Sequence, residues 1–120
     1  MYKDWSKIAA DLTALTKQLR VGVPEPMKAF ADLARSSIAD GALDKKTKEL
    51  IAVGISVATR CDPCIAFHVE AARKAGASRE EVMATVATAI YMGAGPSAMY
   101  AAQALEAFDQ FTAKNTSAAA

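Results

Sequence analysis

The chain has 120 residues, of which 52% are hydrophobic but only 7% aromatic, and its formal net charge is +1 at pH 7. This length fits one domain with its own core, and the interspersed acidic and basic residues offer no basic patch for nucleic acid. Because no apolar run reaches the roughly 20 residues of a membrane span and the N-terminus lacks the apolar segment of a signal peptide, we expect a cytoplasmic protein without nucleic-acid or membrane partners.

Two amphipathic helices are predicted in the first third of the chain. Apolar residues recur at helical spacing in residues 2–19, through Ile8, Leu12 and Leu15, and again in residues 27–39. Between them lies RVGVPEP, whose glycine and two prolines should interrupt any helix.

Two helices are predicted next, and the second half of the first should lie at the centre of the core. The first follows Asp44, a good N-cap, and covers residues 45–60, with a polar first turn and an almost wholly apolar remainder. The second begins in the stretch CDPC, with Asp62 as the expected N-cap and Pro63 as the first helical residue. It should end before Gly76.

Two further helices are predicted in the last third. Ser78 and Glu81 fit a capping box at the start of a helix that runs to about residue 92. GAGPS then interrupts the pattern, and Pro96 opens a final helix that ends near residue 111. The sequence therefore predicts an all-α, single-domain bundle of about six helices over residues 1–120, with 112–120 as a frayed tail.

Both cysteines and the only histidine of the chain lie within eight positions, in Cys61-Asp62-Pro63-Cys64 and His68. A cysteine in the first turn of a helix is close to the positive end of the helix dipole, which stabilises a thiolate. Cys64 should occupy such a place, and His68 follows it by four residues, one turn along the same face. An imidazole there can take the thiol proton directly or through one water. These cues make Cys64 the attacking sulfur and Cys61 its resolving partner.

Other interpretations of this cluster remain open. Buried cysteines and a hydrogen-bonded core histidine would need no function. Zinc binds thiolates and imidazole, but the chain offers three such ligands and would need a carboxylate or water as the fourth. Haem attachment requires histidine directly after the second cysteine, where this chain has Ile65. We expect neither a cofactor nor a bound metal.

Glu49 lies where the polar first turn of the 45–60 helix meets its apolar part. By itself it would be interpreted as a solvated carboxylate near a helix N-terminus. If the helices on either side of Arg60 pack as an antiparallel pair, however, Glu49 lies about as far down one helix as His68 lies up the other. A carboxylate facing the imidazole would fix its tautomer and stabilise its charged form, as the third member of a proton relay.

The spacing of these residues resembles that of the AhpD-like alkylhydroperoxidases, within the carboxymuconolactone decarboxylase superfamily. The shared pattern is Glu49, eleven intervening residues, CDPC, three residues and His68, and the likeness extends over about residues 27–111 through AARKAGASREEV and GAGPSAMYAAQAL. The resemblance implies an AhpD-like all-α fold and a peroxidatic Cys64, with Cys61 as the resolving cysteine and His68 with Glu49 as the proton relay. Better-studied members carry a further histidine where this chain has Pro63. The superfamily's decarboxylases lack the cysteine pair, so the superfamily name does not indicate the activity.

The resemblance also implies a thiol-dependent peroxidase that reduces a hydroperoxide and is reset by a dithiol reductant protein, lipoylated or of peroxiredoxin type. A related alternative is a thiol–disulfide reductase or redox sensor, and one from another class is a zinc-stabilised helical assembly protein. The resemblance further implies assembly as trimers or hexamers. Composition independently favours a homo-oligomer, because aliphatic and methionine residues in the last two helices occupy more faces than one helix pair can bury.

Overall fold

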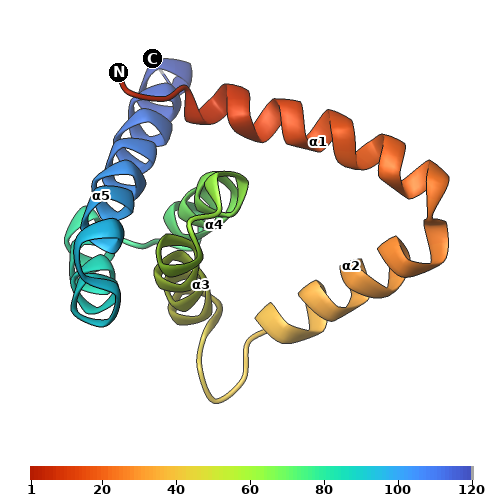
Figure 1. Cartoon of the computed structure of the whole chain (residues 1–120), viewed down its shortest axis with the longest axis horizontal. Coiled ribbons are helices and arrows are strands. Elements are labelled where there is room, and N and C mark those ends of the chain that lie inside the picture. Colours follow the sequence, from red (N-terminus) through yellow and green to blue (C-terminus); the bar gives the residue numbers. More distant parts are fainter. Residues whose placement is uncertain (120) are drawn as a thin grey trace.

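The computed structural model describes residues 1–119, and their side chains as far as residue 116. All of its regular structure in this range is helical, which confirms the predicted all-α fold (Figure 1). The helices are α1 (Trp5–Gly22), α2 (Pro24–Ile38), α3 (Lys45–Thr59), α4 (Asp62–Lys74) and α5 (Arg79–Ala119). Helix α5 continues through 112–119, the segment expected as a frayed tail, and residue 120 lies outside the described residues.

Helix α5 is two helical halves joined at a reversal. Ala94 has φ 56° and ψ −138°, which is not helical, so the break predicted at GAGPS is confirmed. The reversal brings Arg79 Nε within 3.0 Å of Asp109 Oδ1, although these residues are thirty positions apart. Gly93 is required beside the break, because a Cβ there would lie 1.8 Å from Ser97 Oγ. The two halves together with α1–α4 give the predicted total of about six helical segments.

Length and composition alone would allow residues 79–116 to cross a membrane. The reversal at Ala94 divides this stretch, however, and the contact between Arg79 and Asp109 shows that its two ends lie together. It is therefore not one straight apolar span.

The core is formed by α3, α4 and α5, with Trp5 added from the start of α1. Its largest fully buried side chains are Trp5, Ile65, Val53, Val57, Val69 and Val82. The expectation that the second half of α3 is central holds for one face only, because Ile51 and Ile55 on the opposite face are about half exposed. Helices α3 and α4 pack side by side within this body (Figure 1).

Helices α1 and α2 form an arm that projects from the body and returns toward α3 (Figure 1). Helix α1 buries only Trp5, and α2 buries no residue at all. The apolar stripes predicted for both helices exist, but their members are largely solvent-exposed: Leu15 is 56% and Phe30 is 63% exposed. Within one chain the arm contacts the body through the start of α1, where Ile8 and Ala9 pack on the core, and through a smaller contact of α2 with α3.

The predicted interruption within RVGVPEP is present at Val23, but it is shorter than expected. The two helices are separated by Val23 alone, and Pro24 and Pro26 lie in the first turn of α2 rather than in a break. Proline is tolerated in a first turn because the backbone N–H it lacks would have no helical partner there. Helix α2 therefore begins three residues before the predicted start at residue 27.

Two predicted caps are present. The Asp44 side chain accepts from Thr47 N at 2.8 Å, as expected for an N-cap. Ser78 and Glu81 form the reciprocal capping box, with Glu81 N donating to Ser78 Oγ at 3.0 Å and Ser78 N donating to Glu81 Oε1 at 2.9 Å. These caps fix where α3 and α5 begin, and α3 carries Glu49 into the site.

Candidate redox site

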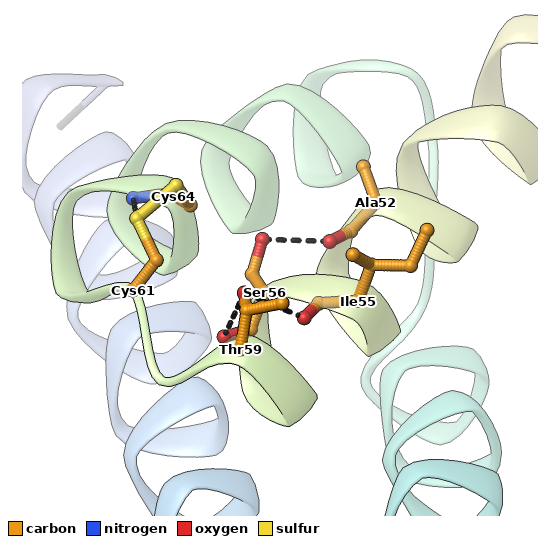
Figure 2. Close-up of a disulfide and its surroundings, with 6 residues drawn as sticks. All are labelled: Ala52, Ile55, Ser56, Thr59, Cys61 and Cys64. Atoms are coloured by element: carbon orange, nitrogen blue, oxygen red, sulfur yellow. Dashed lines mark hydrogen bonds between the residues drawn. A yellow bond between two sulfur atoms is a disulfide. The ribbon is translucent and has the colours of Figure 1, made fainter.

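Cys61 and Cys64 are joined by a disulfide at the start of α4 (Figure 2). The N-cap of this helix is Cys61, not Asp62 as predicted, and Asp62 is the first helical residue. The difference has a physical cause: the Cys61 sulfur accepts from Cys64 N at 3.3 Å, so it takes the capping role expected of the aspartate. All residues from 61 to 64 are partly exposed, which leaves the disulfide accessible from solvent.

A very short connection aligns the two helices that carry the site. Arg60, the residue after α3, has the left-handed conformation with φ 56° and ψ 47°, and its N–H caps the last turn of α3. Cys61 N then donates to Ser56 O at 3.1 Å, which holds the start of α4 against the end of α3. The chain therefore reverses within two residues, as an antiparallel pair requires.

This reversal brings Glu49 and His68 together. His68 Nδ1 lies 2.8 Å from Glu49 Oε2, across the interface between α3 and α4. Glu49 is only 4% exposed, whereas the His68 side chain is 36% exposed. A buried carboxylate on Nδ1 holds the imidazole in one orientation and leaves Nε2 as its free nitrogen. The juxtaposition expected from the sequence is thus observed, and the roles of the two side chains in catalysis stay predictions.

The arrangement concentrates thiolate-stabilising features at one helix start. Both sulfurs lie at the N-terminus of α4, where backbone N–H groups and the helix dipole favour negative charge. His68 lies one helical turn after Cys64 in α4, so its imidazole can exchange a proton with a reactant held beside the Cys64 sulfur. The site can therefore support thiol chemistry in which one sulfur is charged and a nearby imidazole moves protons.

A polar contact that sequence analysis missed lies beside the disulfide. Lys3 Nζ is 2.6 Å from Asp62 Oδ2 and 2.6 Å from Gln103 Oε1. The three residues come from the N-terminal segment, α4 and the second half of α5. No spacing rule could have joined them, because each pair is separated by tens of residues.

No cluster of three or more His, Cys, Asp or Glu side chains arranged to hold a metal occurs in the part of the chain that the structure describes. The two sulfurs are bonded to each other, and the imidazole is bonded to the buried carboxylate. The donor set that the zinc alternative requires is thus engaged in other contacts.

Comparison with known proteins identifies a family and several relatives of this chain. A model of the carboxymuconolactone decarboxylase family matches residues 24–107. An uncharacterized protein of Cupriavidus necator is 40% identical over 105 residues, covering 85% of this chain and 93% of its own length. An uncharacterized protein from the cox locus of Paracoccus denitrificans is 44% identical over 82 residues, covering 68% of this chain and 74% of its own.

Two solved structures share the fold. A carboxymuconolactone decarboxylase family protein from Legionella pneumophila, crystallised in its apo form, superposes with a TM-score of 0.87 at 50% identity, covering 89% of this chain and 96% of its own. A protein of the same family from Thermotoga maritima, for which a role in antioxidative response has been suggested, gives a TM-score of 0.82 at 26% identity. The latter match covers 93% of this chain and 95% of the other.

Proposed function

We propose that the chain, which belongs to the carboxymuconolactone decarboxylase family, is a thiol-dependent peroxidase that reduces hydroperoxides through Cys61 and Cys64. The observation that carries the proposal is the disulfide at a helix N-terminus with the His68–Glu49 pair one turn away. The suggested antioxidative role of the Thermotoga maritima relative agrees with this chemistry.

The first step uses Cys64 as a thiolate. Its sulfur attacks the terminal oxygen of the hydroperoxide, so an S–O bond forms, the O–O bond breaks and an alkoxide leaves. His68, one turn beyond Cys64, gives a proton to the alkoxide, which departs as an alcohol. Glu49 stabilises the imidazolium from which that proton comes, at 2.8 Å. Cys64 is left as a sulfenic acid.

The second step closes the disulfide. Cys61 attacks the Cys64 sulfur as a thiolate, an S–S bond forms, and the sulfenic oxygen leaves as water after taking a proton. The N–H of Cys64, which donates to the Cys61 sulfur at 3.3 Å in the disulfide, is placed to stabilise this second thiolate. An external dithiol then returns two electrons and two protons by exchange through a mixed disulfide.

The test begins with the fully reduced protein and one equivalent of hydrogen peroxide. Mass spectrometry should show conversion to the Cys61–Cys64 disulfide, and a dithiol that survives the pulse would contradict the proposal. A dimedone-type probe separates the two roles: Cys61→Ser should be labelled at Cys64, and Cys64→Ser should not be labelled. Label at Cys61 in Cys64→Ser, with none at Cys64 in Cys61→Ser, would reverse the assignment.

A thiol–disulfide reductase or redox sensor is the second candidate. It is favoured by the position of Cys61, a partly exposed residue whose sulfur accepts a backbone N–H at the N-cap. A reductase would use that sulfur to attack a protein disulfide. Measuring both the rate of peroxide consumption and the rate of reduction of a disulfide substrate distinguishes the two candidates, because a peroxidase is faster in the first assay and a reductase in the second.

We also propose that a dithiol protein, lipoylated or of peroxiredoxin type, serves as the electron donor. The partial exposure of residues 61–64 supports access by another protein. Steady-state peroxide consumption with a panel of dithiol donors identifies the reductant. A location in the cytoplasm, where thiols are kept reduced, is part of the same proposal.

We further propose that copies of the chain assemble as a trimer or hexamer. Support comes from the arm of α1 and α2, because α2 has no buried residue and a lone 15-residue helix is marginal in water. The body offers a second apolar surface, a groove of about 500 Å³ between α3 and the first half of α5. Its apolar lining includes Leu50, Ile51, Ile55 and Met92.

A further inference from the structure

The N-terminal strap, residues 1–4, is fastened along the second half of α5 and lies at the same corner of the molecule as the last turns of α5 (Figure 1). Glu106 accepts from Tyr2 N at 2.6 Å, from Lys3 N at 3.0 Å and from Trp5 Nε1 at 2.8 Å. Gln110 donates to Lys3 O at 2.7 Å. The fully buried Trp5 anchors the strap where α1 begins, so the backbone of Lys3 is held on both sides.

These contacts fix where the Lys3 ammonium lies. It is bonded to Asp62 Oδ2 and to Gln103 Oε1, each at 2.6 Å. It also lies 5.4 to 5.6 Å from the centroids of three aromatic rings, those of Tyr2, Trp5 and Tyr100. Aromatic faces at this distance attract a cation. The Lys3 side chain is 25% exposed, which distinguishes it from the solvated surface lysines.

The partner of Lys3 is the acidic residue between the two cysteines. Asp62 is the first residue of α4, directly after Cys61 and two before Cys64. A negative charge at this place opposes formation of a thiolate on either sulfur, because like charges this close destabilise each other. The Lys3 ammonium cancels much of that charge. We propose that Lys3 is a positioning residue that sets the redox equilibrium of the Cys61–Cys64 pair by neutralising Asp62.

The direction of the effect follows from the redox step itself. Reduction of the disulfide adds two electrons. It takes up two protons when both sulfurs become thiols and one proton when one sulfur stays a thiolate. Whatever stabilises that thiolate stabilises the reduced form and makes the disulfide easier to reduce. Other ionisable groups near the pair are His68 on α4, hydrogen-bonded to Glu49 of α3, and Arg60 between the helices. The strap contributes Lys3, and α5 contributes Gln103 Oε1 and the Tyr100 ring to the contact with its ammonium. Glu106 of α5 accepts from the Lys3 backbone N–H.

Two single variants should therefore move the equilibrium in opposite directions. Lys3→Met leaves the Asp62 charge unopposed, destabilises the thiolate and favours the disulfide. Asp62→Asn leaves the ammonium unopposed and favours the dithiol. We expect each change to be about three- to tenfold in the equilibrium constant, equivalent to about 15–30 mV for a two-electron couple. The double variant should return close to the parent value, and Lys3→Arg should retain it.

The measurement uses the full chain equilibrated at pH 7 in buffers of reduced and oxidised dithiothreitol, acid-quenched, alkylated and analysed by mass spectrometry. Lys7→Met is the matched control, because Lys7 forms an ion pair with Asp11 on the surface and its side chain is 69% exposed. A structural role alone would shift both single variants in the same direction, and that result, or no shift in either variant, would overturn the proposal. Asp62→Asn and Lys3→Arg keep the test decisive if Lys3→Met loosens the strap.

This inference relies on the proposed function only in taking the pair to cycle between disulfide and dithiol. The dithiothreitol equilibrium requires no peroxide, so the two proposals fail separately. Opposite shifts in the single variants, with a dithiol that survives a peroxide pulse, would retain the role of Lys3 and reject the peroxidase. A rapid reaction with peroxide, together with unshifted dithiothreitol equilibria in the variants, would retain the peroxidase and reject the role of Lys3.

Discussion

Glu49→Gln tests the proton relay with the smallest change in shape. Glu49 is 4% exposed and accepts from His68 Nδ1 at 2.8 Å, so glutamine can keep an acceptor in the same place while the charge is removed. A hydrogen bond to a charged group contributes about 1.5–3 kcal/mol, against about 1 kcal/mol for a neutral pair. The transition state, in which the imidazole carries charge, should therefore lose about 0.5–2 kcal/mol of stabilisation, or about two- to thirtyfold in rate.

The assay follows reduced protein mixed with excess hydrogen peroxide, quenched in acid at timed intervals and analysed for dithiol and disulfide. Glu80→Gln removes one negative charge from an exposed position on α5 and serves as the control for net charge. Urea unfolding of both variants checks that the buried glutamine has not loosened the α3–α4 interface. If Glu49→Gln remains folded and reacts within twofold of the parent rate, Glu49 has no part in the relay.

Three further predictions concern the turn, the strap and the arm. Ala94→Gly should stabilise the protein by about 1 kcal/mol in urea unfolding, because glycine adopts the φ of 56° and ψ of −138° of this residue without strain. Gly93→Ala should destabilise the protein, since a Cβ would lie 1.8 Å from Ser97 Oγ. Unfolding midpoints equal to that of the parent would contradict both predictions. Burial acts to raise the pKa of Glu106, but hydrogen bonds from the strap and the indole outweigh it and lower the pKa below the usual 4.5. The stability that these bonds contribute is therefore fully present above about pH 4.5 and is lost as pH falls through the lowered pKa of Glu106. Glu106→Gln should be less stable than the parent at pH 7 and should lose less stability than the parent on acidification to pH 3.5. Equal losses of stability in the two proteins would refute this prediction. Phe30→Asp, at a position 63% exposed in one chain, should lower the mass measured by light scattering at micromolar concentration if the arm packs on another copy, and a parent protein of monomer mass would reject assembly.

The elements that sequence analysis placed well are those set by local chemistry. Asp44 and Ser78 begin helices because their side chains accept backbone N–H groups three residues away, a relation visible in the sequence. The break near Ala94 follows from two glycines and a proline in five residues. Glu49 and His68 could be placed opposite each other because only two residues, Arg60 and Cys61, connect their helices. Helical rise and a tight reversal were sufficient for that prediction.

The features that sequence analysis missed depend on partners far along the chain or on ambiguous local signals. Pro24 and Pro26 fit a break and a first turn equally well, and only the packing decides between them. Aspartate is the better N-cap by preference, so the sequence predicts Asp62 in the capping role that Cys61 takes. Asp62 is instead drawn into an ion pair with Lys3, 59 positions away, which no periodicity could indicate.

The exchange of roles between Cys61 and Asp62 bears on how one helix start could serve two thiolates in turn. The proposed cycle needs charge on Cys64 when peroxide arrives and on Cys61 when the sulfenic acid must be displaced. Cys64 has the imidazole one turn beyond it, and Cys61 has a backbone N–H at 3.3 Å, so each sulfur has its own stabilising group. Had Asp62 been the N-cap, its carboxylate would occupy the N–H that Cys61 uses and would place a negative charge against both sulfurs. Pairing Asp62 with Lys3 removes both obstacles, which makes the strap part of the chemistry of a site 59 residues away.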